Sequence, residues 1–254
     1  MYLEKMFGLN GKVAIVTGGG QGIGQVIAQG LAKAGAEVVI ICRSGASETV
    51  NLITKDGGKA YDIKADVTDE TQVNVALEEI LKRSGSIDIL FNNAGICIHQ
   101  STLQTTIEEF RQVVDVNLTG EFIMARAVGK IMIERGIKGS IINMASMSGT
   151  IVNIPQWQCS YNASKAAVIH MTKSLAVEWA DYGIRVNSLS PGYISTPMAV
   201  DVPIELKQAW LPLMPLHRMG TPEELIPPIL YLASSASSYT TGSDIIVDGA
   251  YSCQ

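Results

Sequence analysis

The sequence predicts an α/β fold in which a mainly parallel β-sheet is covered by helices on both faces. Strand-like and helix-like segments alternate along all 254 residues, and this alternation is typical of such sheets. Residues 38–41 and 87–91 are short, largely apolar runs, which indicates strands that are buried on both faces. No repeat, low-complexity segment or linker interrupts the chain. We therefore expect residues 1–254 to form a single domain.

Short runs rich in β-branched and other apolar residues mark the expected strands. These strands lie near residues 13–17, 37–42, 60–64, 88–91, 140–144, 185–189 and 245–247. Helices are expected between them, and the two longest lie near residues 106–132 and 159–181. In sheets of this kind ligands bind beyond the C-terminal ends of the strands. The segments that follow the strands are therefore where we look for a site.

A glycine-rich segment follows the first expected strand. Residues 18–24 read Gly-Gly-Gly-Gln-Gly-Ile-Gly, and residues 25–34 continue with apolar side chains at helical spacing. Glycines let the backbone approach a pyrophosphate, and the start of the helix supplies N–H donors. The glycine spacing differs from the usual G-x-G-x-x-G pattern, so a tight turn without a ligand is the alternative.

Composition and charge exclude several other functions. A net charge of −5 without a basic block argues against nucleic-acid binding. No apolar run is long enough to span a bilayer, and the N-terminus does not resemble a signal peptide. The four cysteines lack C-x-x-C spacing, and the three histidines suggest no metal site. We expect a soluble, cytoplasmic protein without a metal or a membrane partner.

Tyr161 and Lys165 are the most informative pair of residues in the chain. Side chains four residues apart lie on the same face of a helix. A free phenol ionises near pH 10, and a nearby ammonium lowers that pKa. The pair is thus a candidate proton donor and acceptor for an alcohol or a carbonyl. Taken alone, the pattern is more often part of a solvated helix surface.

Further motifs occur in a consistent order along the chain. Asn-Asn-Ala-Gly ends the fourth expected strand at residues 92–95, Asn117 lies on the following helix, and Pro-Gly at residues 191–192 follows the sixth strand. With residues 17–24, the serines after the fifth strand and the Tyr–Lys pair, this set resembles the short-chain dehydrogenase/reductase family over residues 9–251. The resemblance implies a doubly wound Rossmann fold with a seven-stranded sheet in the order 3-2-1-4-5-6-7.

The resemblance also implies a catalytic set. Tyr161 would be the general acid and base, Lys165 would lower its pKa and hold the cofactor ribose, and Asn117 would relay protons through water. The family usually has its serine thirteen residues before the tyrosine, where Ser148 stands. Ser146, fifteen residues before it, matches the position at the strand end. We expect Ser146 to be catalytic, with Ser148 as the alternative.

The same resemblance places the cofactor along the strand ends. Residues 17–24 would surround the pyrophosphate, residues 66–67 the adenine, residues 93–95 a ribose, and residues 191–196 the nicotinamide. The full set of expected cofactor contacts is Thr17, Gly18, Gln21, Gly22, Ile23, Gly24, Arg43, Ser44, Asp66, Val67, Asn93, Ala94, Gly95, Tyr161, Lys165, Pro191, Gly192, Ile194 and Thr196.

The end of the second strand indicates which nicotinamide cofactor is bound. NAD-specific folds usually have an acidic residue there, which holds the adenosine ribose. This chain has Cys42, Arg43 and Ser44 instead, and the Arg43 guanidinium could pair with a 2′-phosphate. NADP(H) is therefore favoured. NAD(H) is the alternative, with Arg43 as an ordinary surface charge.

The loop at residues 146–157 resembles the polyol and sugar branch of the family, which includes galactitol, arabinitol, mannitol and sorbose enzymes. Hydrogen-bonding side chains could recognise a polyhydroxylated substrate. The expected substrate contacts are Ser146, Ser148, Asn153, Gln156, Tyr161 and Tyr193. Alternatively, Asn153 and Gln156 only tie down the loop. The resemblance further implies a substrate lid at residues 198–217 and a homotetramer.

Two other functions remain open at this point. A β-ketoacyl-carrier-protein reductase of the same family would grip an acidic carrier with basic residues. Lys130 could be one of them, but Val177 stands where an arginine is expected. A non-catalytic dinucleotide-binding regulator is the second alternative. Such proteins commonly lack the Tyr or the Lys, and this chain has both.

Overall fold

The computed structural model describes residues 2–196 and 208–253. Its centre is a seven-stranded sheet in the order β3-β2-β1-β4-β5-β6-β7, and every pair of neighbouring strands is parallel. The strands are β1 (Val13–Thr17), β2 (Glu37–Ile41), β3 (Lys59–Ile63), β4 (Ile89–Asn92), β5 (Ser140–Met144), β6 (Arg185–Pro191) and β7 (Asp244–Val247). The predicted fold and strand order are confirmed, and no predicted strand boundary is wrong by more than two residues.

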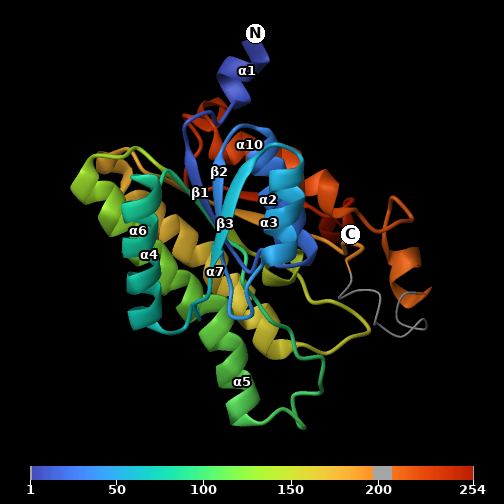
Figure 1. Ribbon diagram of the computed structural model, residues 1–254. Helices are drawn as coiled ribbons and strands as arrows, with labels where there is room; N and C mark the ends of the chain where they lie inside the picture. The colour runs from blue at the N-terminus through green and yellow to red at the C-terminus, as the bar shows by residue number, and fades with distance from the viewer. Residues whose placement is uncertain (1, 197–207, 254) are drawn as a thin grey trace.

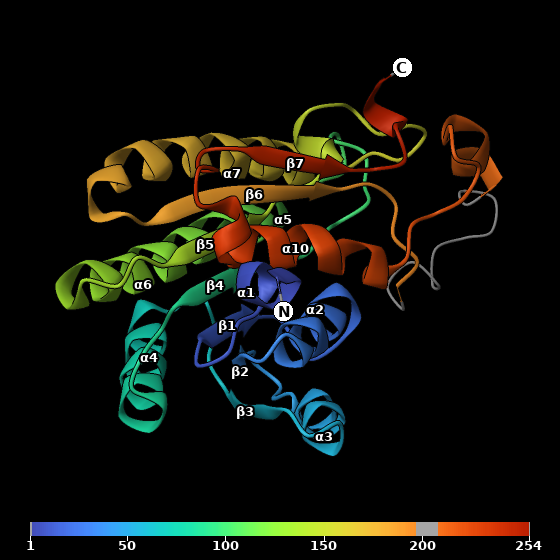
Figure 2. The ribbon, with the colours of Figure 1, turned by 90° about the horizontal axis from the view of Figure 1, so that it is seen from above.

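Helices cover both faces of the sheet (Figures 1 and 2). The helices on the two faces are α2 (Gly22–Lys33), α3 (Ser47–Lys55), α4 (Glu70–Ser84), α5 (Ile107–Val114), α6 (Glu121–Arg135), α7 (Cys159–Glu178) and α10 (Ile226–Ala233). The short helix α1 (Tyr2–Phe7) has no buried residue and projects beyond the end of the sheet in Figure 1. Short 3₁₀ turns lie at η2 (Met147–Gly149), η3 (Ala180–Tyr182), η4 (Leu211–Leu213), η5 (Pro222–Leu225), η6 (Ser235–Ser237) and η7 (Tyr251–Cys253). No helix in the part of the chain that the structure describes is long and apolar enough to cross a membrane.

The two-residue period of the strands divides the core between the two faces. Along β1, Ile15 packs with apolar side chains of α4, α6 and α7. Its neighbours Ala14 and Val16 point the other way and pack with side chains of α2, α3 and α10. Because both faces are covered, the central strands are fully buried, which explains their continuous apolar sequence.

The long helix expected near residues 106–132 is interrupted. A π-helical segment, η1 (Asp115–Gly120), separates α5 from α6 and contains Asn117. The prediction of one regular helix is therefore wrong at this place. A π-helical turn shifts the register of the side chains, and such turns are frequent at functional sites. Here the turn lies beside the loop that follows β4, because Asn117 hydrogen-bonds Ile96.

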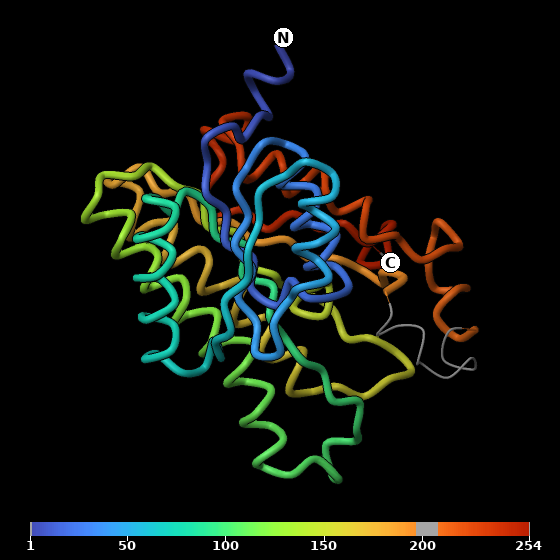
Figure 3. Tube along the Cα trace, in the orientation of Figure 1, coloured from blue at the N-terminus to red at the C-terminus, as the bar shows by residue number. Residues whose placement is uncertain are grey.

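The connections place several loops at one end of the sheet. The loop after β5 and the chain after β6 leave the same end, as the trace in Figure 3 shows. The loops after β1 and β4 meet there as well, because Asn93 donates hydrogen bonds to Thr17 and Gly18. These are the C-terminal ends of the strands, where the sequence predicts a ligand.

Candidate active site

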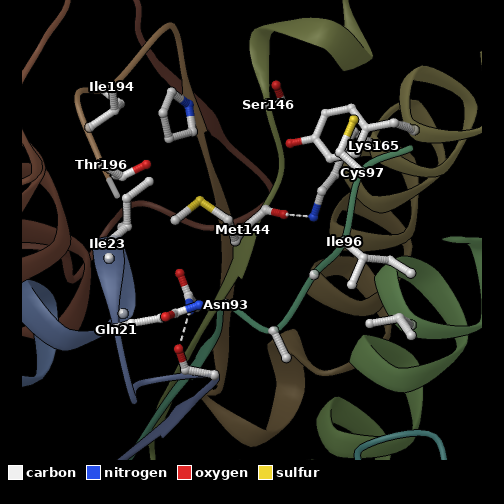
Figure 4. Close-up of a pocket in the computed structure, with 18 of the residues that line it drawn as sticks. Gln21, Ile23, Asn93, Ile96, Cys97, Met144, Ser146, Lys165, Ile194 and Thr196 are labelled. Carbon is white, nitrogen blue, oxygen red and sulfur yellow. Dashed lines mark hydrogen bonds between the residues drawn. The ribbon is translucent and has the colours of Figure 1, made fainter. Parts of the chain in front are cut away.

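A cavity of about 920 Å³ lies along the C-terminal ends of the strands. Figure 4 shows Ser146, Cys97 and Lys165 on one side of this cavity and Gln21, Ile23, Ile194 and Thr196 on the other. The predicted site residues that line it are Gly18, Gln21, Gly22, Ile23, Gly24, Arg43, Ser44, Asp66, Val67, Asn93, Ala94, Gly95, Ser146, Ser148, Asn153, Gln156, Tyr161, Lys165, Pro191, Gly192, Tyr193, Ile194 and Thr196. Residues from most of the chain therefore converge on one cavity.

The glycine-rich loop is shaped to hold a phosphate group. Gly18 has a φ of +65°, and a Cβ there would meet Ala94 Cα at 3.0 Å. A Cβ on Gly24 would meet the side-chain Nδ2 of Asn93 at 2.5 Å, so the glycines let the loop after β4 pack closely against the glycine-rich loop. The N-cap residue Gln21 makes no side-chain hydrogen bond to the first turn of α2. The N–H groups of that turn thus remain available to an anion, which fits a dinucleotide pyrophosphate.

Thr17 has a different place from the one predicted. It is 1% exposed and lies behind the cavity wall, so a direct contact with a pyrophosphate is not supported. Its hydroxyl accepts hydrogen bonds from the backbone N–H groups of Asn93 at 2.9 Å and Ala94 at 3.0 Å. Thr17 therefore joins β1 to the loop after β4. The sequence cannot distinguish a threonine at a strand end that faces a ligand from one that faces a neighbouring loop.

Arg43 and Ser44 follow β2 at one end of the cavity. The Arg43 side chain is 70% exposed, and its Nη1 lies 4.0 Å from Asp66 Oδ2. Lys64, which sequence reasoning missed, lies against the same loop, because a Cβ on Gly45 would meet its Cε at 3.0 Å. The Arg43 guanidinium lines the cavity and is suited to a phosphate group on the adenosine ribose, whereas Lys64 is not part of the cavity lining.

Tyr161 and Lys165 lie on α7 and face the cavity. Lys165 Nζ is 5.9 Å from the centre of the Tyr161 ring. The lysine is 2% exposed, and it donates hydrogen bonds to the Met144 carbonyl and to Glu121 Oε1, the latter at 3.1 Å. A Cβ on Gly95 would meet Lys165 Nζ at 3.8 Å, so the absence of a side chain there keeps the space in front of the ammonium open.

The pKa of Tyr161 differs from the prediction. Burial raises it above the ordinary value of 10.0, whereas the charge of Lys165 and a hydrogen bond from Ser146 lower it. The thiol of Cys97, when it is ionised, and the carboxylate of Glu121 also raise it, so the net direction is upward. The lysine does act as the sequence suggests, but in the protein alone its effect is outweighed. Sequence spacing reveals the ammonium and cannot reveal the cost of burying a phenolate.

The geometry favours Ser146 over Ser148 beside the tyrosine. Ser146 lies directly after β5 and lines the cavity together with Tyr161, and its hydroxyl lowers the pKa of that tyrosine. The Ser148 hydroxyl donates to Asn153 Oδ1 at 2.6 Å and accepts from Gln158 Nε2 at 3.2 Å. Ser148 is therefore held within the loop, while Ser146 lies where a substrate oxygen would meet Tyr161.

Asn117 is completely buried and does not itself line the cavity. Its Oδ1 accepts from the Ile96 N–H at 2.8 Å, and its Nδ2 donates to the Ile96 carbonyl at 2.9 Å and to Ser164 Oγ at 3.1 Å. With these bonds the side chain ties the loop after β4 to α7. Its contribution to the site is thus to position the loop that carries Gly95.

A cluster of buried polar side chains forms the far wall of the cavity. Tyr193 donates to Gln156 Oε1 at 3.0 Å and accepts from Asn153 Nδ2 at 3.3 Å. Gln158, which sequence reasoning missed, donates through Nε2 to Ser148, to Asn153 at 3.1 Å and to Asn162 Oδ1 at 2.9 Å. These bonds hold the loop together, as one of the two readings of Asn153 and Gln156 expects, and they also present amides and hydroxyls to the cavity.

The segment expected to be a lid is only partly described. Residues 197–207 lie outside the described residues, and the remainder follows as a helical turn and η4. Trp210 is buried and stacks on Tyr193 with ring centres 4.4 Å apart, and Tyr251 meets the same tyrosine edge-on at 5.4 Å. Trp210 and Tyr251 therefore pack on the ring of Tyr193, whose hydroxyl belongs to the polar cluster.

Comparisons with known proteins agree with this geometry. A family model described as enoyl-(acyl carrier protein) reductase matches residues 18–252. A sorbose reductase from Candida albicans is 47% identical over 252 residues, which are 98% of this chain and 89% of that protein. An NADP-dependent mannitol dehydrogenase from Alternaria alternata is 42% identical over 255 residues, covering 98% of this chain and 95% of its own. The crystal structure of a short-chain type dehydrogenase/reductase from Mycobacterium marinum is 46% identical, covers both chains fully and superposes with a TM-score of 0.94.

The fold, the glycine cradle and the Tyr–Lys–Ser site define a nicotinamide-dependent oxidoreductase that acts on CH–OH groups. The chain belongs to the short-chain dehydrogenase/reductase family. The predicted family and the predicted class of enzyme are both confirmed.

Proposed function

We propose that the protein interconverts a polyol and a ketose with NADP(H) as the hydride carrier. The observation that carries this proposal is the convergence of Ser146, Tyr161 and Lys165 in the cavity that also contains the glycine cradle. The sorbose reductase and the NADP-dependent mannitol dehydrogenase among its relatives support this substrate class. They favour it over a β-ketoacyl-carrier-protein reductase and over a non-catalytic regulator.

Each site residue has a distinct task in this proposal. The bound nicotinamide accepts or supplies the hydride. Tyr161 takes the hydroxyl proton when the alcohol is oxidised and returns it when the ketone is reduced. Ser146 donates to the reacting oxygen and stabilises the negative charge that develops on it. Lys165 stabilises the phenolate of Tyr161. Asn117 fixes the loop after β4, which lies beside these two residues, by a hydrogen bond to Ile96.

A substrate screen tests the proposal directly. Purified protein is mixed with NADPH or NADP⁺ and with pentitols, hexitols, ketoses and β-keto esters, and the reduced-nicotinamide absorbance is followed. We expect turnover of at least one polyol–ketose pair. Activity on β-ketoacyl thioesters alone would favour the carrier-protein reductase. NADPH binding without turnover of any compound would favour a regulator.

Replacing Arg43 by alanine should change the cofactor preference. Loss of one charge-assisted contact to a 2′-phosphate should lower kcat/KM for NADPH by about 10-fold and leave kcat/KM for NADH within about twofold. Arg135→Ala is the matched control, because Arg135 ends α6 and donates to Gly85 instead. An equal loss with both cofactors would show that Arg43 does not recognise the 2′-phosphate.

Separate replacement of the two serines should distinguish their roles. Ser146→Ala removes a donor to the reacting oxygen, and we expect kcat to fall by about 10²-fold. Ser148→Ala removes one hydrogen bond within the loop, and we expect a loss below about 10-fold, mainly in KM. Steady-state kinetics of both variants on the same substrate give the comparison. A larger loss of kcat from Ser148→Ala would reverse the assignment.

We also propose that the protein works as a homotetramer in the cytoplasm. Apolar side chains remain exposed on the helices beside the sheet, among them Phe110, Phe122 and Val177, which is 81% exposed. All four cysteines are free thiols, which fits a reducing compartment. Light scattering of the purified protein gives the assembly mass, and a monomeric mass would contradict the tetramer.

A further inference from the structure

A buried carboxylate lies next to the catalytic lysine. Glu121 begins α6 and is 2% exposed, as is Lys165, and its Oε1 accepts a hydrogen bond from Lys165 Nζ at 3.1 Å. Its second oxygen, Oε2, is buried without a hydrogen-bond partner among the described residues. Carboxylates are rarely buried without full compensation, because desolvating the charge is costly. An acidic residue in the first turn of a helix at the surface would be solvated by water and would not need a buried lysine as its partner.

The local structure fixes Glu121 in this place. The π-helical segment ends at Gly120. A Cβ at this position would meet Val67 Cγ2 at 2.8 Å, so the absence of a side chain on Gly120 lets the backbone pass close to the loop after β3. Asn92 at the end of β4 donates through Nδ2 to the Glu121 carbonyl at 3.1 Å and to Asn143 Oδ1 at 3.0 Å. The backbone of Glu121 is thus tied to the two central strands, and its side chain is held against Lys165.

The ammonium of Lys165 therefore has two competing neighbours. The titratable groups that act on Tyr161 are Lys165, Cys97 and Glu121. Burial raises the pKa of the Cys97 thiol to about 12, so that thiol stays neutral at ordinary pH. The charge balance at the phenol then depends on Lys165 and Glu121. The negative charge of Glu121 partly offsets the positive charge of Lys165, so the ammonium stabilises the phenolate of Tyr161 less than it would alone.

We propose that Glu121 is a positioning residue that sets the pH range of the enzyme by sharing the Lys165 ammonium with Tyr161. The inference rests on the proposed oxidoreductase function and assigns a role in it to a residue outside the Ser–Tyr–Lys set. Burial raises the pKa of Glu121 to about 7, against the opposing effect of Lys165. In the alkaline range where Tyr161 ionises, Glu121 is therefore an anion and opposes that ionisation.

The sign of the expected effect follows from this charge balance. Alcohol oxidation needs the phenolate, so activity rises with pH through the pKa of Tyr161. Glu121→Gln removes the negative charge and keeps an oxygen for Lys165. The ammonium then favours the phenolate more strongly, and the acid limb of the kcat–pH profile should move to lower pH by at least about 0.5 unit. Asp88→Asn is the matched control, because Asp88 pairs with Lys12 and bonds the Val13 N–H just before β4. Its profile should coincide with that of the wild type.

A second measurement needs neither cofactor nor turnover. The tyrosinate absorbance of the cofactor-free protein is titrated, and the curve of Tyr161→Phe is subtracted to isolate Tyr161. In the wild type we expect ionisation above the ordinary phenol pKa of 10.0, and in Glu121→Gln a downward shift that matches the kinetic one. Unchanged titration and unchanged kinetic profile in Glu121→Gln would overturn the inference.

The design separates the two proposals. If no polyol or ketose is turned over by the wild type, the proposed function fails, while the spectroscopic titration still tests Glu121. If Glu121→Gln does not fold, the inference is tested by the pKa of Tyr161, which is obtained from the difference between the tyrosinate titrations of the wild type and Tyr161→Phe. A Tyr161 that ionises well below the ordinary phenol pKa in the cofactor-free protein would show that Glu121 does not withhold the lysine charge.

Discussion

Tyr161→Phe is expected to lower kcat by at least about 10²-fold, the usual scale for the loss of a general acid or base. The aromatic ring stays in place on α7, and the change removes only the phenolic hydroxyl. Fold and cofactor binding should therefore persist. Steady-state kinetics give kcat, and calorimetric titration with NADP⁺ gives the affinity, which should stay within about threefold because no bond to Lys165 is lost.

Tyr182→Phe is the control for the loss of a phenolic hydroxyl. Tyr182 lies in η3 after α7 and is 51% exposed, away from the cavity. It should behave as the wild type. Near-normal turnover in Tyr161→Phe would remove Tyr161 from its role as acid and base. A loss of NADP⁺ affinity as large as the loss of kcat would point to a structural role instead.

Gly24→Ala should weaken cofactor binding. The added methyl group would meet Asn93 Nδ2 at 2.5 Å and the Gly18 carbonyl at 2.6 Å, so the glycine-rich loop and the loop after β4 must move apart. Each charge-assisted hydrogen bond to the pyrophosphate that is lost costs about 1.5–3 kcal/mol. We expect the Kd for NADP⁺ to rise at least about 10-fold, measured by calorimetry, with a fall in Tm.

Gly57→Ala controls for general destabilisation in this experiment. Gly57 has a φ of +84°, so alanine is strained there, but no atom of the described residues lies within 4 Å of the added Cβ. The variant should lose some stability, of the order of 1 kcal/mol, without losing affinity for NADP⁺. If Gly24→Ala bound NADP⁺ as tightly as Gly57→Ala does, the cradle would not be the cofactor site.

The strands and the site-bearing loops could be predicted because their signals are local. Buried parallel strands have continuous apolar sequences, and residues 13–17 and 38–41 show this pattern without ambiguity. The glycines of the cradle and the Tyr–Lys spacing are also local patterns. Together with the resemblance to the family and the positions of the strand ends, they predicted many of the residues that line the cavity, including Arg43 at one end and Tyr193 at the other.

The remaining features depend on tertiary packing. The π-helical turn around Asn117 depends on contacts with the loop after β4, so a regular helix was the natural prediction. Glu121 reads in sequence as an ordinary solvated acid, and only the fold reveals that it is buried against Lys165. Gln158 precedes α7 like any capping residue, and its three acceptors come from other parts of the loop and helix. The upward shift of the Tyr161 pKa likewise results from burial, which spacing cannot show.

The central claim is that Ser146 and Tyr161 together hold the reacting oxygen beside the bound nicotinamide. A crystal structure of the protein with NADP⁺ and a polyol that the screen identifies tests it most directly. We expect both hydroxyls within about 3.2 Å of one substrate oxygen, with the adjacent carbon facing the nicotinamide ring. A substrate bound with that carbon away from the ring, or with Tyr161 out of reach of any substrate oxygen, would contradict the claim.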